Sequence, residues 1–169
     1  MVREEHDRFI DLYAAKVSHS IAYIADLAEI SWSDGIAETV KHLLVAERFW
    51  SQVIASLRPG EAIPGPPGND VLLIDGPALL PAYREALPAI VAGFRSPSPS
   101  FASATFRFAG AGVQGLEFLW SVLAHHAYHL GQIDAAMRAQ GCSPRGFFPW
   151  ARAGKPAKGE KPNAAIGID

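Results

Sequence analysis

The chain of 169 residues has one cysteine, a net charge of only −2 and no long apolar run. Its single cysteine, Cys142, has no partner for an internal disulfide, so nothing argues for secretion. A protein that binds nucleic acid needs a basic patch or stripe, which this charge balance does not indicate. No apolar run approaches the ~20 residues of a membrane span, and the N-terminus carries charge from Arg3 onward, unlike a signal peptide. We therefore expect a cytoplasmic protein with neither nucleic acid nor membrane among its partners.

What the sequence does contain is enough apolar material for a core, since 49% of its residues are hydrophobic. We expect one domain over residues 1–145 and a C-terminal extension over residues 146–169. The extension opens with the aromatic cluster Phe147, Phe148 and Trp150 and then becomes polar and rich in Lys, Gly and Pro. This composition predicts that the aromatic cluster packs on the domain or on a partner and that the extension is partly flexible.

Four segments show the apolar spacing of amphipathic helices, and they predict helices over residues 4–28, 35–57, 78–94 and 113–140. Prolines and glycines exclude a helix over residues 58–77, and a connection of this length suits a crossover that returns the next helix parallel. Pro88 predicts a kink or a split in the third helix. The alternation of Phe101, Phe106 and Phe108 before the fourth helix allows a short extended piece or a roof over a pocket, and plain packing of these rings over one end of the bundle is the favoured interpretation. The pattern therefore predicts the all-α class, as a four-helix bundle in up-down-down-up order.

Three histidines within five residues mark the last predicted helix. His125 and His129 are one turn apart and share a face, so they present two imidazoles to one ion. His42, at the edge of the apolar stripe of the second helix, is the best candidate for a third ligand. In an antiparallel pair, His42 and His129 lie ~12 Å and ~17 Å from the same end of the bundle at 1.5 Å per residue. The two levels agree within a turn, which permits one shared ion.

The same histidines also allow other interpretations. His126 and His129 are three residues apart and could chelate an ion instead, although His126 lies on the main apolar stripe of its helix. The histidines could alternatively hydrogen-bond across the core without any metal. The sequence has no His-Glu-x-x-His pattern, so a zinc protease is not supported. The roles of Glu38 and Glu47, both in the second helix, stay open.

Two segments have a familiar pattern. The first is His125-His-Ala-Tyr-His-Leu-Gly-Gln-Ile133, in which two histidines four residues apart are followed by x-Gly-Gln. The second is Val40-Lys-His-Leu-Leu-Val-Ala-Glu-Arg-Phe-Trp50, in which a histidine precedes a glutamate and aromatic residues. Together they resemble the DinB/YfiT-like superfamily over roughly residues 5–141. One departure is Leu130, at a position that is often Arg in that family.

The resemblance implies a four-helix bundle, often dimeric, with a divalent ion such as Zn or Ni bound by three histidines. Carried onto this sequence, the ligands become His42, His125 and His129. Three imidazoles also suit Co, Fe or Mn, so the sequence does not select the metal. A homodimer and a small-molecule substrate are the expected partners.

Three protein ligands leave coordination positions open, as in catalytic rather than closed metal sites. Members of the superfamily are similar to metal-dependent transferases that use low-molecular-weight thiols, so the first hypothesis is transfer of such a thiol to a small electrophile. Metal-dependent hydrolysis, with Glu38 as a candidate base, is the second hypothesis. The third is a non-catalytic, metal-binding, stress-related dimer. Cys142 lies beyond the last helix without a basic partner in sequence and is a poor candidate nucleophile.

Overall fold

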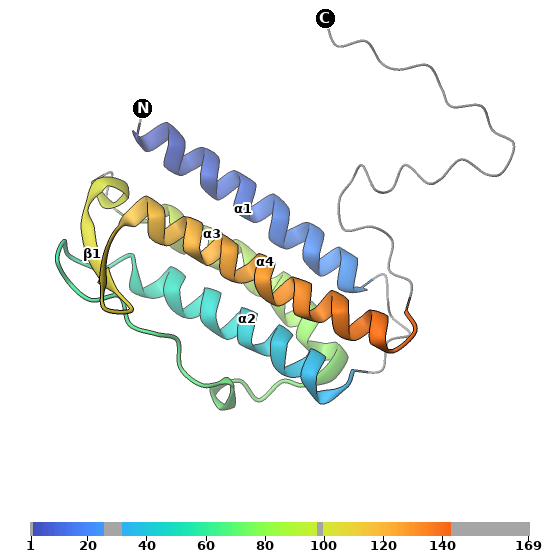
Figure 1. Ribbon diagram of the computed structural model, residues 1–169. Coiled ribbons are helices and arrows are strands. Elements are labelled where there is room, and N and C mark those ends of the chain that lie inside the picture. Colours follow the sequence, from blue (N-terminus) through green and yellow to red (C-terminus); the bar gives the residue numbers. More distant parts are fainter. Residues whose placement is uncertain (1, 26–31, 98–99, 143–169) are drawn as a thin grey trace, which may run out of the picture.

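The computed structural model describes residues 2–25, 32–97 and 100–142 (Figure 1). Its α-helices are α1 (Val2–Ala25), α2 (Asp34–Val53), α3 (Leu79–Arg95) and α4 (Gly115–Ala139). Three short 3₁₀ turns lie between them: η1 (Asn69–Val71), η2 (Gly76–Ala78) and η3 (Phe101–Ser103). The strands β1 (Thr105–Phe108) and β2 (Ala111–Gln114) pair as an antiparallel hairpin. The described chain is thus mostly helical, as predicted, and this small sheet is its departure from a purely α-helical fold.

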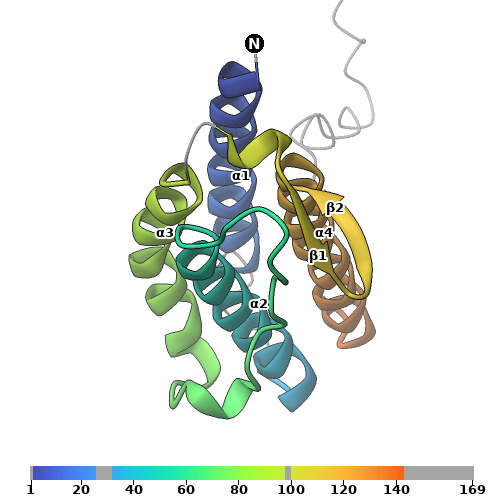
Figure 2. The ribbon, with the colours of Figure 1, turned by 90° about the vertical axis from the view of Figure 1, so that its left-hand side faces the viewer.

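The four helices lie lengthwise beside one another (Figures 1 and 2). The colour gradient in Figure 1 shows that α1 and α4 run in one direction and that α2 and α3 run in the other. Each helix turns its apolar stripe inward, and each fully buried large apolar side chain stabilises the fold by about 1.5–3 kcal/mol. The largest side chains of this core include Tyr13, Ile36, Leu43, Ile90, Phe94, Phe118 and Ile133.

The ends of two helices differ from the sequence prediction. The α2 helix ends at Val53, four residues early, and a turn leads into Gly60, which has a φ of 86°. The α4 helix begins at Gly115 and not at Val113, because Val113 pairs with Phe106 in the hairpin. A Cβ at Gly115 would stand 2.1 Å from the carbonyl oxygen of Phe101, so only glycine fits this close approach.

Two other boundary features can be compared with their predictions. The α3 helix continues through Pro88 without a split. Proline removes one backbone hydrogen bond, but Pro88 and Arg84, whose carbonyl loses its partner, are both exposed, so water can reach that carbonyl. Gly141 follows α4 with a φ of 81°, and the Cys142 N–H donates to the carbonyl of Met137 at 3.1 Å. Gly141 therefore caps α4 directly after the predicted helix end at residue 140.

The connection between α2 and α3, residues 54–78, lies across the outer side of α2 (Figure 2). The indole N–H of Trp50 donates to the carbonyl of Pro64 at 3.1 Å. The ammonium group of Lys41 forms an ion pair with Asp75 at 2.5 Å. These contacts tie both halves of the connection to α2. One residue of the connection, Asn69, lies near the candidate site.

No helix in the described ranges combines the length and the apolar character needed to cross a membrane. The predicted C-terminal extension, with Phe147, Phe148 and Trp150, lies outside the described residues, as do the last residues of the first predicted helix.

Candidate metal centre

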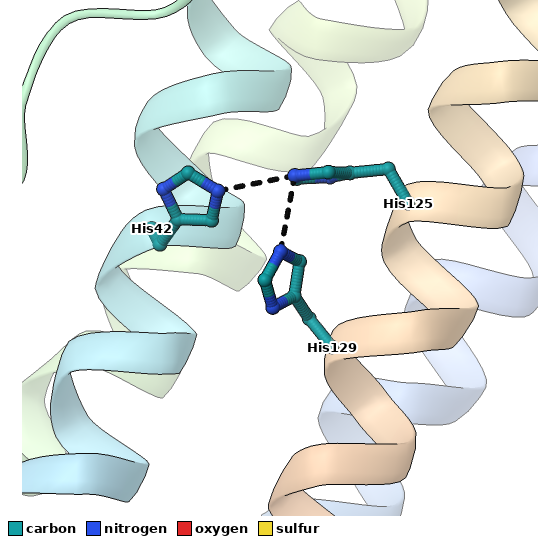
Figure 3. Close-up of side chains that lie close together, drawn as sticks. All are labelled: His42, His125 and His129. Atoms are coloured by element: carbon teal, nitrogen blue, oxygen red, sulfur yellow. Dashed lines mark hydrogen bonds between the residues drawn. The ribbon is translucent and has the colours of Figure 1, made fainter.

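Three histidine side chains converge between α2 and α4 (Figure 3). His42 comes from α2, and His125 and His129 come from consecutive turns of α4. The Nε2 atom of His125 lies 3.0 Å from Nε2 of His42 and 3.1 Å from Nε2 of His129. Nitrogen atoms bound to one zinc ion at 2.0–2.1 Å stand roughly 3–3.4 Å apart for bond angles between octahedral and tetrahedral values. The structure thus brings together the three predicted residues as a group that could hold a metal ion.

The donor set fits a cation better than it fits hydrogen bonds among the histidines. An imidazole nitrogen carries either one N–H or one lone pair, yet Nε2 of His125 faces two other ring nitrogens at once. One ion can instead accept a lone pair from each of the three rings. The Nδ1 atom of His125 is buried without a hydrogen-bond partner in the described chain, so no hydrogen bond from that side holds this ring in place.

The electrostatics of the cluster favour neutral imidazoles. Burial, followed by the neighbouring His129 and His42, lowers the pKa of His125 to about 4. Burial and His129 also lower the pKa of His42. Metal ligation requires the deprotonated nitrogen, so these two histidines are ready to bind at neutral pH without first losing a proton.

Two aromatic side chains flank the cluster. The ring of Trp50 packs edge-on against His125 with centroids 5.2 Å apart, and Trp50 is buried. Tyr128 packs edge-on against His129 at 5.1 Å and is exposed. All three histidines are half-buried. The cluster is therefore covered on the Trp50 side and reachable from solvent on the other.

A hollow of about 310 Å³ lies between α2 and the α2–α3 connection. Its wall includes Val45 and Phe49, three and seven residues beyond His42, and Pro67 and Val71, which stand two residues to either side of Asn69. None of the three histidines lines this hollow, although its walls come from the same segments that hold His42. Its size is within the range of small-molecule sites.

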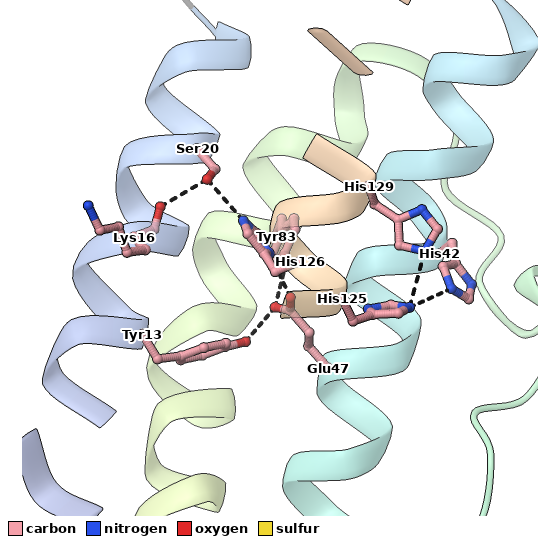
Figure 4. A network of polar contacts seen from close by, with 9 residues as sticks. All are labelled: Tyr13, Lys16, Ser20, His42, Glu47, Tyr83, His125, His126 and His129. Carbon is pink, nitrogen blue, oxygen red and sulfur yellow. Dashed lines mark hydrogen bonds and ion pairs between the residues drawn. The ribbon is translucent and has the colours of Figure 1, made fainter. Parts of the chain in front are cut away.

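His126 is absent from the cluster and points into the core instead (Figure 4). It belongs to a buried network of five side chains that draws on all four helices: Tyr13, Ser20, Glu47, Tyr83 and His126. The Glu47 carboxylate is completely buried and accepts hydrogen bonds from the hydroxyls of Tyr13 (2.5 Å) and Tyr83. His126 Nδ1 lies 2.7 Å from the other carboxylate oxygen. The alternative chelate of His126 with His129 is therefore wrong.

Hydrogen-bond accounting fixes the protons of this network. The hydroxyl of Ser20 donates to the carbonyl of Lys16, so it can only accept at its 2.9 Å contact with Nε2 of His126. Nε2 therefore carries a proton, and a further proton is shared across the contact between Nδ1 and Glu47. Burial and the Glu47 carboxylate raise the pKa of Tyr13 and Tyr83 well above the ordinary value, so both hydroxyls stay protonated as donors. Every polar atom of the Glu47–His126 pair thus has a partner within the protein.

Sequence reasoning left out two residues near the cluster. Gln132, present in the x-Gly-Gln motif, lies 2.7 Å from Nδ1 of His129 through its side-chain oxygen. Asn69, in the irregular α2–α3 connection, is a polar neighbour of His42 that acts to raise the pKa of this histidine, against the larger effect of burial. Its amide donates to Glu38, the candidate base, whose carboxylate is also 3.9 Å from the ammonium group of Lys41. Cys142 is half-buried beyond α4 and takes no part in the cluster.

The sequence matches no known protein-family model, and comparisons with curated proteins and with solved structures find no match either. The DinB/YfiT-like family therefore stays a prediction from the two motifs.

Proposed function

We propose that this protein binds one divalent metal ion through Nε2 of His42, His125 and His129. The observation that carries the proposal is the convergence of three ring nitrogens, with two contacts of 3.0 and 3.1 Å to one shared nitrogen. The lowered pKa values of His42 and His125 support it, because they leave these two rings neutral. Zinc and nickel are the first metals to test, and cobalt, iron and manganese follow.

We also propose that the chain is a DinB/YfiT-like four-helix bundle in up-down-down-up order. Two motifs support this assignment, one around His42 and one running from His125 to Ile133. The helix directions support it as well, because α1 is parallel to α4 and both run opposite to α2 and α3. Homodimerisation and a cytoplasmic location accompany this family assignment as predictions.

The activity that we propose is transfer of a low-molecular-weight thiol to a small electrophile. A divalent ion held by three imidazoles keeps positions open for an exchangeable ligand and lowers the pKa of a thiol bound there. The chain holds the three imidazoles between two helices, and Trp50 excludes water from the side of His125. The exposed side of the cluster, next to Tyr128, is where a small thiol can approach. The hollow beside Val45 and Phe49 is a candidate place for an apolar part of the electrophile.

Hydrolysis is the weaker alternative, because it needs a general base that can reach a water molecule. Glu38 is the nearest sequence candidate, but its carboxylate is engaged by Asn69 at 2.8 Å and has Lys41 at 3.9 Å. The remaining alternative, a non-catalytic metal-binding dimer involved in stress response, shares the metal site and differs in lacking exchange at the ion. The experiments therefore test metal binding first and exchange second.

Metal binding is tested by elemental analysis of protein purified without a histidine tag. The wild type should contain about one equivalent of a divalent metal, and His129→Ala should lose it. His19→Ala is the matched control, because His19 lies on α1 outside the three-histidine group, and it should retain the metal. A folded wild type that is metal-free and takes up neither zinc nor nickel would overturn the proposal.

Exchange is tested by titrating cobalt-substituted protein with low-molecular-weight thiols. A thiol-dependent change in the visible cobalt spectrum, together with consumption of an added electrophile, is the result expected of a transferase. A spectrum that no thiol changes would favour the non-catalytic alternative, and turnover of an ester without any thiol would favour the hydrolase.

A further inference from the structure

The ring of His129 has a hydrogen-bond partner on the side away from the cluster. Its Nδ1 lies 2.7 Å from the side-chain oxygen of Gln132, one turn further along α4. An amide oxygen only accepts, so Nδ1 must carry the proton. A neutral imidazole has one N–H, and Nε2 is then left with a lone pair directed toward His42 and His125. The amide nitrogen of Gln132 donates to the hydroxyl of Tyr128 at 3.1 Å, which is consistent with this orientation.

We propose that Gln132 is a positioning residue of the metal site, which fixes the ligand His129 in the tautomer that turns the Nε2 lone pair toward the ion. This inference rests on the proposed metal binding and adds a residue that touches a ligand and not the metal. His125 differs, because its Nδ1 has no partner in the described chain and its ring is held by packing against Trp50. Outer hydrogen bonds of this kind orient a ligand and raise its basicity.

The test measures zinc affinity by competition with a chromophoric chelator in tag-free protein. Gln132→Met has nearly the same shape but no acceptor, and it should bind zinc about 10- to 100-fold more weakly. Gln132→Glu retains an acceptor that cannot donate, and it should bind at least as tightly as wild type. The control Gln52→Met, which changes an exposed residue with no contact to a histidine, should bind as wild type does.

A second readout does not depend on metal. Long-range ¹H–¹⁵N NMR of the metal-free protein should show His129 as the Nδ1–H tautomer in wild type and as a tautomer mixture in Gln132→Met. Wild-type zinc affinity in Gln132→Met, or an equal loss in Gln132→Glu and Gln132→Met, would overturn the positioning role. If wild type binds no zinc at all, the proposed function fails, and the tautomer of His129 still decides whether Gln132 positions the ring.

Discussion

His125 and His126 are adjacent in α4, but their side chains lie in two different polar regions, the histidine cluster and the buried network. His126 lies in the buried network, where Glu47 and Ser20 engage both of its nitrogens. His125, rotated by about 100° around the helix, faces two other imidazoles and has a buried Nδ1 without a partner in the described chain. Both regions cross-link α2 to α4, but only the buried network does so with groups that complement one another.

The difference indicates which of the two polar regions needs a ligand from outside the protein. A buried polar group is costly unless it is hydrogen-bonded, and the network around Glu47 meets this demand with side chains of all four helices. Its completeness indicates a structural role. Three lone-pair donors that converge on one another complement no group in the described chain, so they indicate a cation.

The largest expected effect comes from removing the centre of the buried network. Glu47→Ala should lower the free energy of unfolding by about 3–5 kcal/mol, because His126, Tyr13 and Tyr83 lose their common buried partner. Urea unfolding of the metal-free protein measures the change. The exposed Glu85→Ala on α3 is the matched control and should stay within about 0.5 kcal/mol of wild type. A loss below about 1 kcal/mol in Glu47→Ala would contradict the structural role of the network.

A smaller effect is expected from removing one donor of the same network. Tyr13→Phe deletes the hydroxyl that lies 2.5 Å from Glu47 and should lower the free energy of unfolding by about 1.5–3 kcal/mol. Tyr128→Phe, which changes an exposed tyrosine next to the histidine cluster, should leave it nearly unchanged. Equal stability of the two variants would contradict the claim that the buried network contributes more to stability than the polar groups next to the histidine cluster.

A third effect, which depends on pH, sharpens the same comparison. The pKa of His125 is lowered to about 4 and that of His42 is lowered as well, whereas an unfolded histidine titrates near 6.5. Below pH 6.5 the unfolded chain therefore binds protons that the folded metal-free protein does not, and stability falls as the pH decreases toward 4. Urea unfolding in the presence of a chelator should show this decline, and His125→Gln should make it shallower. An unchanged slope in His125→Gln would rule out this origin.

The sequence predicted the parts of the fold and site that depend on regular helical spacing. The spacing of His125 and His129 and the apolar stripe next to His42 favoured this group of three, and the ring of His42 lies close to both others, with centroids 5.1 Å from His125 and 4.8 Å from His129. The glycine at position 141 likewise marked the end of α4.

What the sequence did not predict depends on contacts between segments that have no common period. Asn69 lies near His42 in an irregular connection, and its position is determined by tertiary contacts such as that with Glu38. Val113 was predicted to begin the fourth helix but lies in β2, because its pairing with Phe106 outweighs a weak local preference for helix. The roles of the Tyr13 and Tyr83 hydroxyls were not predicted either, since a helical stripe does not show which hydroxyl meets a buried carboxylate.

One spectrum tests the contrast between the two regions most directly. Long-range ¹H–¹⁵N NMR reports both ring nitrogens of every histidine, and it can be recorded before and after addition of one equivalent of zinc. Large shifts at Nε2 of His42, His125 and His129, with the nitrogens of His126 nearly unmoved, are the predicted result. Unchanged spectra at the three histidines, or a zinc shift centred on His126, would contradict the account.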